Sequence, residues 1–213
     1  MYHTDAVILK LGEWSEADWL VTAFTRDFGK IRLLAQGARK HGAKLQGHLE
    51  PGAITALSFV IGRNGYRLTS AHLQESFSET RRSLSKSRTS AGILRLLDQN
   101  LFEERDRSGE LFETACRTFF AIAEAKRLAT LQRLGAWFYV RFFAFLGLLP
   151  AVDSPEARDA QTIFLIGSVA LGDLERFPVR EETLATELVW LSRELARAGS
   201  DPRAVEATAF ALY

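Results

Sequence analysis

The feature that most constrains this fold is a change in hydrophobic period close to residue 79. Before it, short apolar runs are broken by glycine-containing turns, a pattern that is typical of β-strands. After it, apolar residues recur about every 3.6 positions, as they do along one face of an α-helix. A chain of 213 residues is long enough for two small domains. We therefore predict an α+β chain with a strand-built domain at residues 1–79 and an all-α helical domain at 80–213.

The first domain is expected to contain five short strands. Gly29 can take the positive φ that a hairpin needs, and the pair Asn64-Gly65 is a strong hairpin signal. Several strands are apolar on both faces, which favours a small closed barrel. The five-stranded OB-fold is the favoured candidate, although an SH3-like barrel would give a similar pattern. The expected strands are residues 6–11, 19–25, 30–38, 54–61 and 66–71.

The second domain is expected to be a helical bundle. A segment at residues 126–146 is apolar nearly all round, as the central helix of a bundle is, and Pro150 would end it. The apolar stretch at 134–149 is short for a membrane span and contains Arg141, so we interpret it as part of that buried helix. The other helices are expected at residues 93–101, 111–122, 156–171, 181–198 and 202–212.

The sequence contains no pattern typical of a catalytic site or a metal centre. A phosphate-binding glycine loop, a nucleophile elbow and a zinc-ligand pattern are all missing from it. Its single cysteine, Cys116, cannot form an intramolecular disulfide and is interpreted as core filler on an apolar helix face. The acids Glu13, Glu16 and Asp18 are interpreted as a solvated turn. We expect a cytoplasmic protein that is not an enzyme and has no metal or other cofactor.

Basic residues are concentrated in one segment although the net charge is only +1. Between residues 26 and 44, six cations face a single acid. The loop at 37–47 can follow a phosphate backbone, with Trp19, Phe28 and Tyr66 as stacking surfaces. The alternative is a solvated loop beside core aromatics. The candidate nucleic-acid contacts are these six cations and one in the later hairpin: Arg26, Lys30, Arg32, Arg39, Lys40, Lys44 and Arg63.

Several stretches together resemble the RecO family of bacterial DNA-repair proteins. The most specific is SEADWLVTAFTRDFGKI at residues 15–31, which is similar to the N-terminal signature of that family. The segments AQGARK at 35–40, LQGHLEP at 45–51 and LTSAHLQESF at 68–77 also resemble it. In the helical half, FYVRFFAFLGLLP at 138–150 is similar to an arginine-bearing helix of the family. The resemblance covers about residues 5–150.

The resemblance implies functions that composition does not show. It implies an OB-fold that binds single- and double-stranded DNA, anneals complementary strands, and acts near the nucleoid. It further implies that the protein works with RecR to load RecA onto DNA coated by single-strand DNA-binding protein (SSB). The helical domain would take up the acidic, phenylalanine-ended tail of SSB, and Arg133 and Arg141 are the expected partner-binding residues.

Two departures from the family pattern limit this reading. Trp19 stands where the family usually has a basic residue, which removes one expected phosphate contact. Many members carry a four-cysteine zinc module after the arginine-bearing helix, whereas residues 151–213 contain no cysteine. The alternative function is therefore a diverged RecO-like adaptor that binds proteins and has little affinity for DNA.

Overall fold

The structure is a computed structural model that describes residues 1–63, 65–103, 109–149 and 161–197. Its internal contacts divide the chain into two compact units. The first contains Met1–Ser78 together with Asn100–Cys116, and the second contains Glu79–Gln99 together with Arg117–Tyr213. We refer to them as the barrel unit and the helical unit and describe each by itself.

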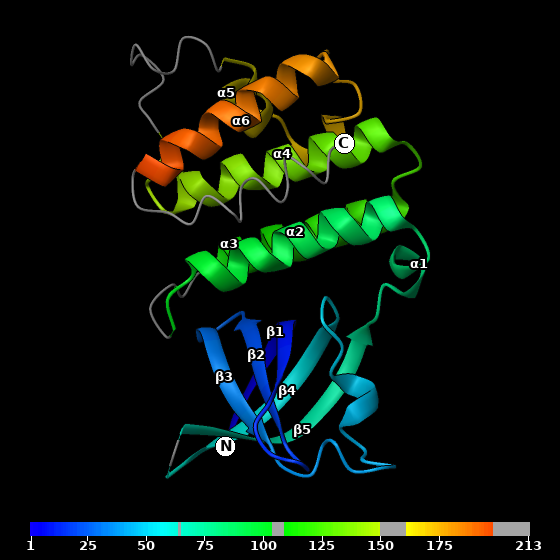
Figure 1. Ribbon diagram of the computed structural model, residues 1–213, viewed down its shortest axis with the longest axis vertical. Helices are drawn as coiled ribbons and strands as arrows, with labels where there is room; N and C mark the ends of the chain where they lie inside the picture. Colours follow the sequence, from blue (N-terminus) through cyan, green and yellow to red (C-terminus); the bar gives the residue numbers. More distant parts are fainter. Residues whose placement is uncertain (64, 104–108, 150–160, 198–213) are drawn as a thin grey trace. The chain divides into compact units, whose positions relative to one another are not determined.

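Five strands of the barrel unit close into a barrel (Figure 1). Their order around it is β1-β2-β3-β5-β4, with β3 and β5 parallel and the other neighbours antiparallel. This is the order of an OB-like barrel, so the prediction of an OB-like fold is confirmed over the SH3-like alternative. The strands are β1 (Tyr2–Glu13), β2 (Trp19–Thr25), β3 (Gly29–Ala35), β4 (Ile54–Gly62) and β5 (Gly65–Glu75).

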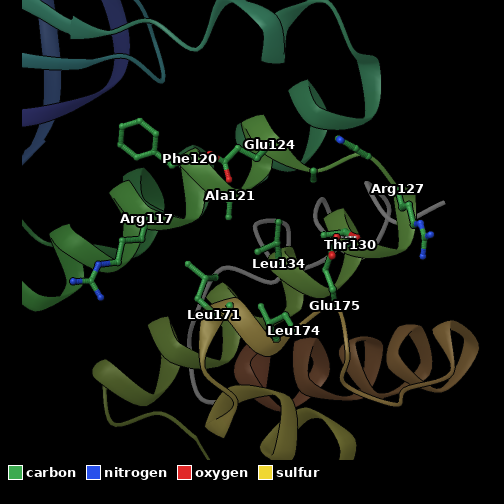
Figure 2. Close-up of a pocket in the computed structure, with 13 residues that line it drawn as sticks. Arg117, Phe120, Ala121, Glu124, Arg127, Thr130, Leu134, Leu171, Leu174 and Glu175 are labelled. Carbon is green, nitrogen blue, oxygen red and sulfur yellow. Dashed lines mark hydrogen bonds between the residues drawn. The ribbon is translucent and has the colours of Figure 1, made fainter.

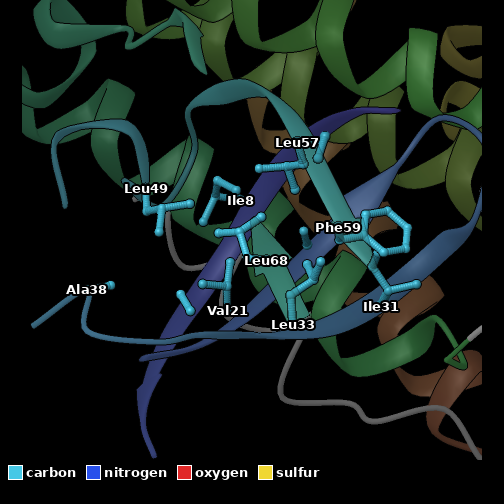
Figure 3. Close-up of a cluster of buried hydrophobic side chains, with 12 residues drawn as sticks. Ile8, Val21, Ile31, Leu33, Ala38, Leu49, Leu57, Phe59 and Leu68 are labelled. Carbon is cyan, nitrogen blue, oxygen red and sulfur yellow. The ribbon is translucent and has the colours of Figure 1, made fainter. Parts of the chain in front are cut away.

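The barrel is filled by apolar side chains that alternate along its strands (Figure 3). Val21, Ile31, Leu33 and Phe59 are each at most 1% exposed. Because successive strand residues point to opposite faces, a period of two supplies one such side chain to the core every second position. Burial of this apolar area is the main term that favours the folded barrel.

The hairpin between β2 and β3 forms as its sequence predicts. Gly29 has φ +67°, a left-handed conformation that a side chain would disfavour. The Thr25 hydroxyl donates to the Gly29 carbonyl at 2.8 Å and accepts from the Phe28 amide at 3.0 Å. By contrast, β3 ends at Ala35 rather than at residue 38, because Gly37 takes φ +69° and turns the chain away from the sheet.

The helical unit contains one helix that is buried along most of its length. Helix α4 (Leu128–Phe145) packs against α5 (Gln161–Ser168) and α6 (Glu181–Arg197), with Tyr139, Phe142 and Phe143 completely buried. Gly167 of α5 lies against Val140, where a Cβ would clash with the valine side chain. The remaining elements are α1 (Ser78–Arg81), α2 (Leu84–Asn100), α3 (Gly109–Glu124) and the short 3-10 turns η1 (Gln46–His48) and η3 (Leu171–Asp173).

Helix boundaries differ from the predicted ones mainly where polar residues interrupt the hydrophobic period of the helix. Helix α2 begins at Leu84, not at residue 93, because its first turns carry serine, lysine and arginine. The predicted helix at 202–212, the stop at Pro150 and the beginning of the helix predicted at 156–171 lie outside the described residues. Within the described part of the chain, no helix is long and apolar enough to cross a membrane.

Candidate nucleic-acid interface

The outer faces of β2 and β3 form the surface on which OB-fold proteins commonly bind oligonucleotides. One end of this surface is covered by residues 100–103 and 109–116 of the same unit. The Phe24 ring lies 5.9 Å from that of Phe112, and the Lys30 Nζ donates to the Leu101 carbonyl at 3.2 Å. Lys30 is only 9% exposed. We therefore remove Lys30 from the candidate phosphate contacts, because its ammonium is buried and bonded within the protein.

Two further candidate cations are paired with acids of the same unit. The Arg32 Nε lies 2.7 Å from a carboxylate oxygen of Glu103. Arg26 contacts Glu113 at 2.9 Å and Asp5 at 3.4 Å. The basic segment therefore presents less net positive charge than its sequence indicates, because acids from distant parts of the chain neutralise part of it.

Arg39 has a positioning role in this structure. Its guanidinium donates to Glu13 at 2.9 Å and to the Ser15 carbonyl at 2.7 Å, and it lies over the Trp19 ring at 5.2 Å. These contacts tie the loop 36–53 to the turn 14–18. Trp19 is therefore covered by an arginine and does not offer the open stacking surface that the sequence analysis expected.

Asp18 holds the same two loops together. Its carboxylate accepts a hydrogen bond from the Gly37 amide at 2.7 Å. The Gly37 amide, followed by the Ser15 hydroxyl, lowers the pKa of the Asp18 carboxyl below its usual value. The turn predicted as merely solvated thus fixes the start of the basic loop.

The cations that remain open to solvent lie in the two loops at the ends of the barrel strands. Lys40 and Lys44 are exposed in the loop after β3, and Arg63 is exposed at the β4–β5 hairpin. Arg67 of β5, which the sequence analysis missed, is also exposed and pairs in register with Leu34 of β3. These four side chains are the candidate phosphate contacts that the structure supports.

A pocket of about 390 Å³ lies at the uncovered end of the β2–β3 surface. Trp14, in the turn between β1 and β2, is 59% exposed there. Phe28, by contrast, packs edge-on against Tyr2 and Phe59 inside the barrel. The pocket is lined by Trp14, Leu20, Arg32, Leu34, Gly65, Tyr66 and Glu103. The signal for Trp14 was its place in a polar turn, where a core aromatic residue is not expected.

Comparison with known proteins identifies the family of this barrel. Residues 1–77, which contain all five strands, match the family described as Recombination protein O N terminal. The barrel belongs to the RecO N-terminal domain family.

Relatives named DNA repair protein RecO match well beyond the barrel. That of Syntrophus aciditrophicus is 32% identical over 154 residues, which are 71% of this chain and 58% of the relative. That of Desulforamulus reducens is 28% identical over 171 residues, covering 78% of this chain and 65% of the relative. The chain thus spans less than two thirds of the length of these RecO proteins.

The helical unit contains a larger pocket, of about 730 Å³ (Figure 2). Leu134 of α4 and Leu171 and Leu174 beyond α5 supply apolar walls, and Phe120 of α3 is 46% exposed at it. Its charged lining residues are Arg117, Glu124, Lys126, Arg127 and Glu175. The combination of cations and apolar side chains suits an acidic peptide with an apolar end.

The two arginines expected to bind a partner do not line this pocket. The Arg133 guanidinium donates to the carbonyls of Leu174 and Glu175, at 3.2 and 2.8 Å, and so holds a pocket wall in place. Arg141 is exposed and lies over the Trp137 ring at 5.3 Å. The cations that do line the pocket are Arg117, Lys126 and Arg127. The partner-binding role of Arg133 and Arg141 stays a prediction.

The titratable side chains do not converge on a reactive centre in the described residues. Burial raises the pKa of the Cys116 thiol to about 12, with Glu113 adding to the effect, so the nucleophilic thiolate is scarce at neutral pH. His48 accepts a hydrogen bond from the Leu73 amide. Within the described part of the chain, no three metal-ligating side chains come together.

Proposed function

We propose that this chain is a DNA-binding protein of recombinational repair that anneals complementary strands. The observation that carries the proposal is the RecO match over residues 1–77, because it falls on an OB-like barrel with exposed cations in its loops. Lys40, Lys44, Arg63 and Arg67 would neutralise phosphates. Phosphate contacts of this kind position a strand without reading its sequence.

Annealing by such a surface requires no catalytic residue. Two complementary strands repel each other through their phosphates, and bound cations reduce that repulsion. Base pairing then supplies the free energy of the reaction. The barrel therefore acts by bringing the two strands together.

A salt titration of the unmodified protein tests this proposal. With about four phosphate contacts on single-stranded DNA, the plot of log affinity against log salt should have a slope near −3. A fourfold rise in salt should then weaken binding by roughly 50-fold. A fluorescent oligonucleotide followed by anisotropy gives both numbers. Absence of binding at low salt would favour the alternative of a protein-binding adaptor.

We expect Glu103→Gln to tighten DNA binding. The change removes the carboxylate that lies 2.7 Å from Arg32 and competes with a phosphate for that guanidinium. Loss of this competitor should strengthen the contact between Arg32 and a phosphate, steepen the salt slope by about 0.7 and raise affinity about fivefold at 0.1 M salt. Glu110→Gln is the matched control, since it makes the same charge change on exposed α3 and should leave both values unchanged. If Glu103→Gln and Glu110→Gln bound DNA with equal affinity, Arg32 would not contact a phosphate.

For the helical unit, we propose that the pocket at Phe120 binds the acidic, phenylalanine-ended tail of SSB. The apolar walls would receive the phenylalanine ring, and Arg117, Lys126 and Arg127 would pair with carboxylates. Cooperation with RecR in loading RecA is supported by the family resemblance and belongs to the same proposal. Tail binding would bring the barrel to strands that SSB already covers.

We expect Lys126→Ala/Arg127→Ala to weaken binding of an acidic peptide with a C-terminal phenylalanine. A charge-assisted hydrogen bond contributes about 1.5 kcal/mol or more, so loss of the pair should cost tenfold or more in affinity. Arg141→Ala, which removes an exposed charge outside the pocket, should bind the peptide like the parent. Isothermal titration with the free peptide measures both. If Arg141→Ala instead weakened peptide binding more than the double variant did, the peptide would contact Arg141 and not the cations of the pocket.

A further inference from the structure

We propose that the pocket at Trp14 is a subsite for one unpaired nucleotide of single-stranded DNA. The base would stack on the Trp14 indole, and its phosphate would take the place of Glu103 at Arg32. The proposal rests on the DNA-binding function proposed above and goes further, because it predicts that the barrel prefers unpaired strands. Lys40 and Lys44, by comparison, would serve single and double strands alike.

The floor of the pocket is apolar and open to solvent. Leu20 of β2 and Leu34 of β3 are cross-strand partners that point away from the barrel core, and both are only partly buried. Farther along the same face, Phe24 is completely buried and in contact with Phe112. The face therefore carries apolar side chains at both ends, with the Thr22–Arg32 pair between them, but a protein segment covers only one of the two ends. A flat, apolar nucleobase has the shape and polarity to cover the other end.

One wall of the pocket carries an aromatic side chain at a defined place. Trp14 belongs to a closed turn in which its amide donates to the Asp18 carbonyl at 3.2 Å. Asp18 itself is bonded to the Gly37 amide, so the turn is tied to the neighbouring loop. Because the backbone of this turn is already fixed, stacking of a base on the Trp14 indole, which is 59% exposed, would cost side-chain entropy but little backbone entropy.

Another part of the pocket lining leaves space. Gly65 has φ +106°, and no atom lies within 4 Å of the place where its Cβ would be. Beside it, Tyr66 contacts Phe59 edge-on at 5.0 Å and is thereby anchored to the barrel core. The pocket of about 390 Å³ therefore has one exposed aromatic wall, one open glycine wall and an apolar floor.

In the charged part of the pocket, Arg32 can exchange its carboxylate partner Glu103 for a phosphate of DNA. Arg32 and Glu103 both line it and form an ion pair at 2.7 Å, with side chains 53% and 42% exposed. At this exposure the pair is weak and open to competition. A phosphate can replace the carboxylate and also accept two parallel hydrogen bonds from the guanidinium. Arg67, next to Leu34 in register, adds positive charge nearby.

Duplex DNA cannot use this subsite in the same way, because its base faces are already stacked on their neighbours. Replacement of Trp14 should therefore affect single strands alone. For Trp14→Ala we expect affinity for a single-stranded oligothymidylate to fall by roughly 5- to 150-fold, the range for loss of one stacked base. Trp14→Phe keeps an aromatic face and should stay within about threefold of the parent. Duplex affinity should be unchanged in both variants.

The decisive experiment measures anisotropy for the parent, Trp14→Ala and Trp14→Phe with three probes: oligothymidylate, a duplex of equal length and a strand of abasic residues. The abasic strand keeps its phosphates, so it should bind the parent and Trp14→Ala alike. Circular dichroism confirms that the variants are folded. Unchanged oligothymidylate affinity in Trp14→Ala, or an equal loss on all three probes, would overturn the subsite. Failure of the parent to bind any probe would instead overturn the proposed function.

Discussion

Lys40→Ala/Lys44→Ala is expected to lower affinity for single-stranded DNA about 25-fold at 0.1 M salt. Both side chains are exposed in the loop after β3, and the double change removes about two of four phosphate contacts. The slope of log affinity against log salt should become shallower by about 1.4. Because phosphate contacts carry no sequence information, every oligonucleotide should be affected alike. Annealing of complementary strands should slow in parallel.

The matched control for this variant lies in the other unit. Lys126→Ala/Arg127→Ala removes the same charge from exposed positions at the helical pocket. It should keep the parent's salt slope of DNA binding and lose affinity for the acidic peptide. Lys40→Ala/Lys44→Ala should instead have a shallower salt slope and keep the parent's affinity for the peptide. If both variants lose DNA equally, only overall charge matters and the basic loop is no specific surface. If neither loses DNA, the protein-binding adaptor becomes the better function.

The barrel could be predicted from the sequence because its turns are encoded locally. Gly29 and Gly65 each take the positive φ that their hairpins require, and β2 has the predicted bounds. The helical bundle was predicted for a similar reason, since α4 is apolar nearly all round. Both features depend on residues that are close together in the chain, so one sequence is enough to reveal them.

The site was predicted less well because its electrostatics depend on contacts between distant residues. Lys30 and Arg32 read as open cations, yet Leu101 and Glu103, about seventy positions later, bind them. No local sequence pattern predicts these contacts. Arg39 is similar, since it lies in the loop after β3 and its partner Glu13 is the last residue of β1. Counting cations along a segment therefore overestimates the charge that a ligand meets.

Trp14 shows the opposite failure. Trp19, Phe28 and Tyr66 were the predicted stacking surfaces, because they lie in or beside strands that are close to basic residues. Trp19 is covered by Arg39, and Phe28 packs within the barrel. Aromatic residues in strands usually belong to a core. A place in a turn does not by itself predict a surface contact, because Phe28 lies in the turn between β2 and β3 and still packs against the core, whereas Trp14 is 59% exposed.

Phe59→Ala is expected to destabilise the barrel by about 3–5 kcal/mol, the usual cost of removing a buried phenylalanine. Phe59 of β4 is completely buried, and its ring centroid lies 5.0–5.3 Å from those of Tyr2, Phe28 and Tyr66. Its loss leaves a cavity among four strands or hairpins that cannot all move inward, because the closed barrel fixes their spacing. Single-strand binding should fall with the folded fraction.

Ile61→Ala is the control for that prediction, since Ile61 lies two positions farther along β4 and is 65% exposed. Its replacement should change stability by no more than about 0.5 kcal/mol. Native-state hydrogen exchange at the amides of β1 and β4 reports the opening free energy of the barrel itself, apart from the helical unit. A loss below about 1 kcal/mol for Phe59→Ala would mean that the ring cluster is not what stabilises the barrel. A loss of about 3–5 kcal/mol would show that the ring cluster around Phe59 stabilises the barrel. Tyr66 belongs to this cluster and also lines the pocket at Trp14, so the same residue would contribute to core packing and to the proposed base subsite.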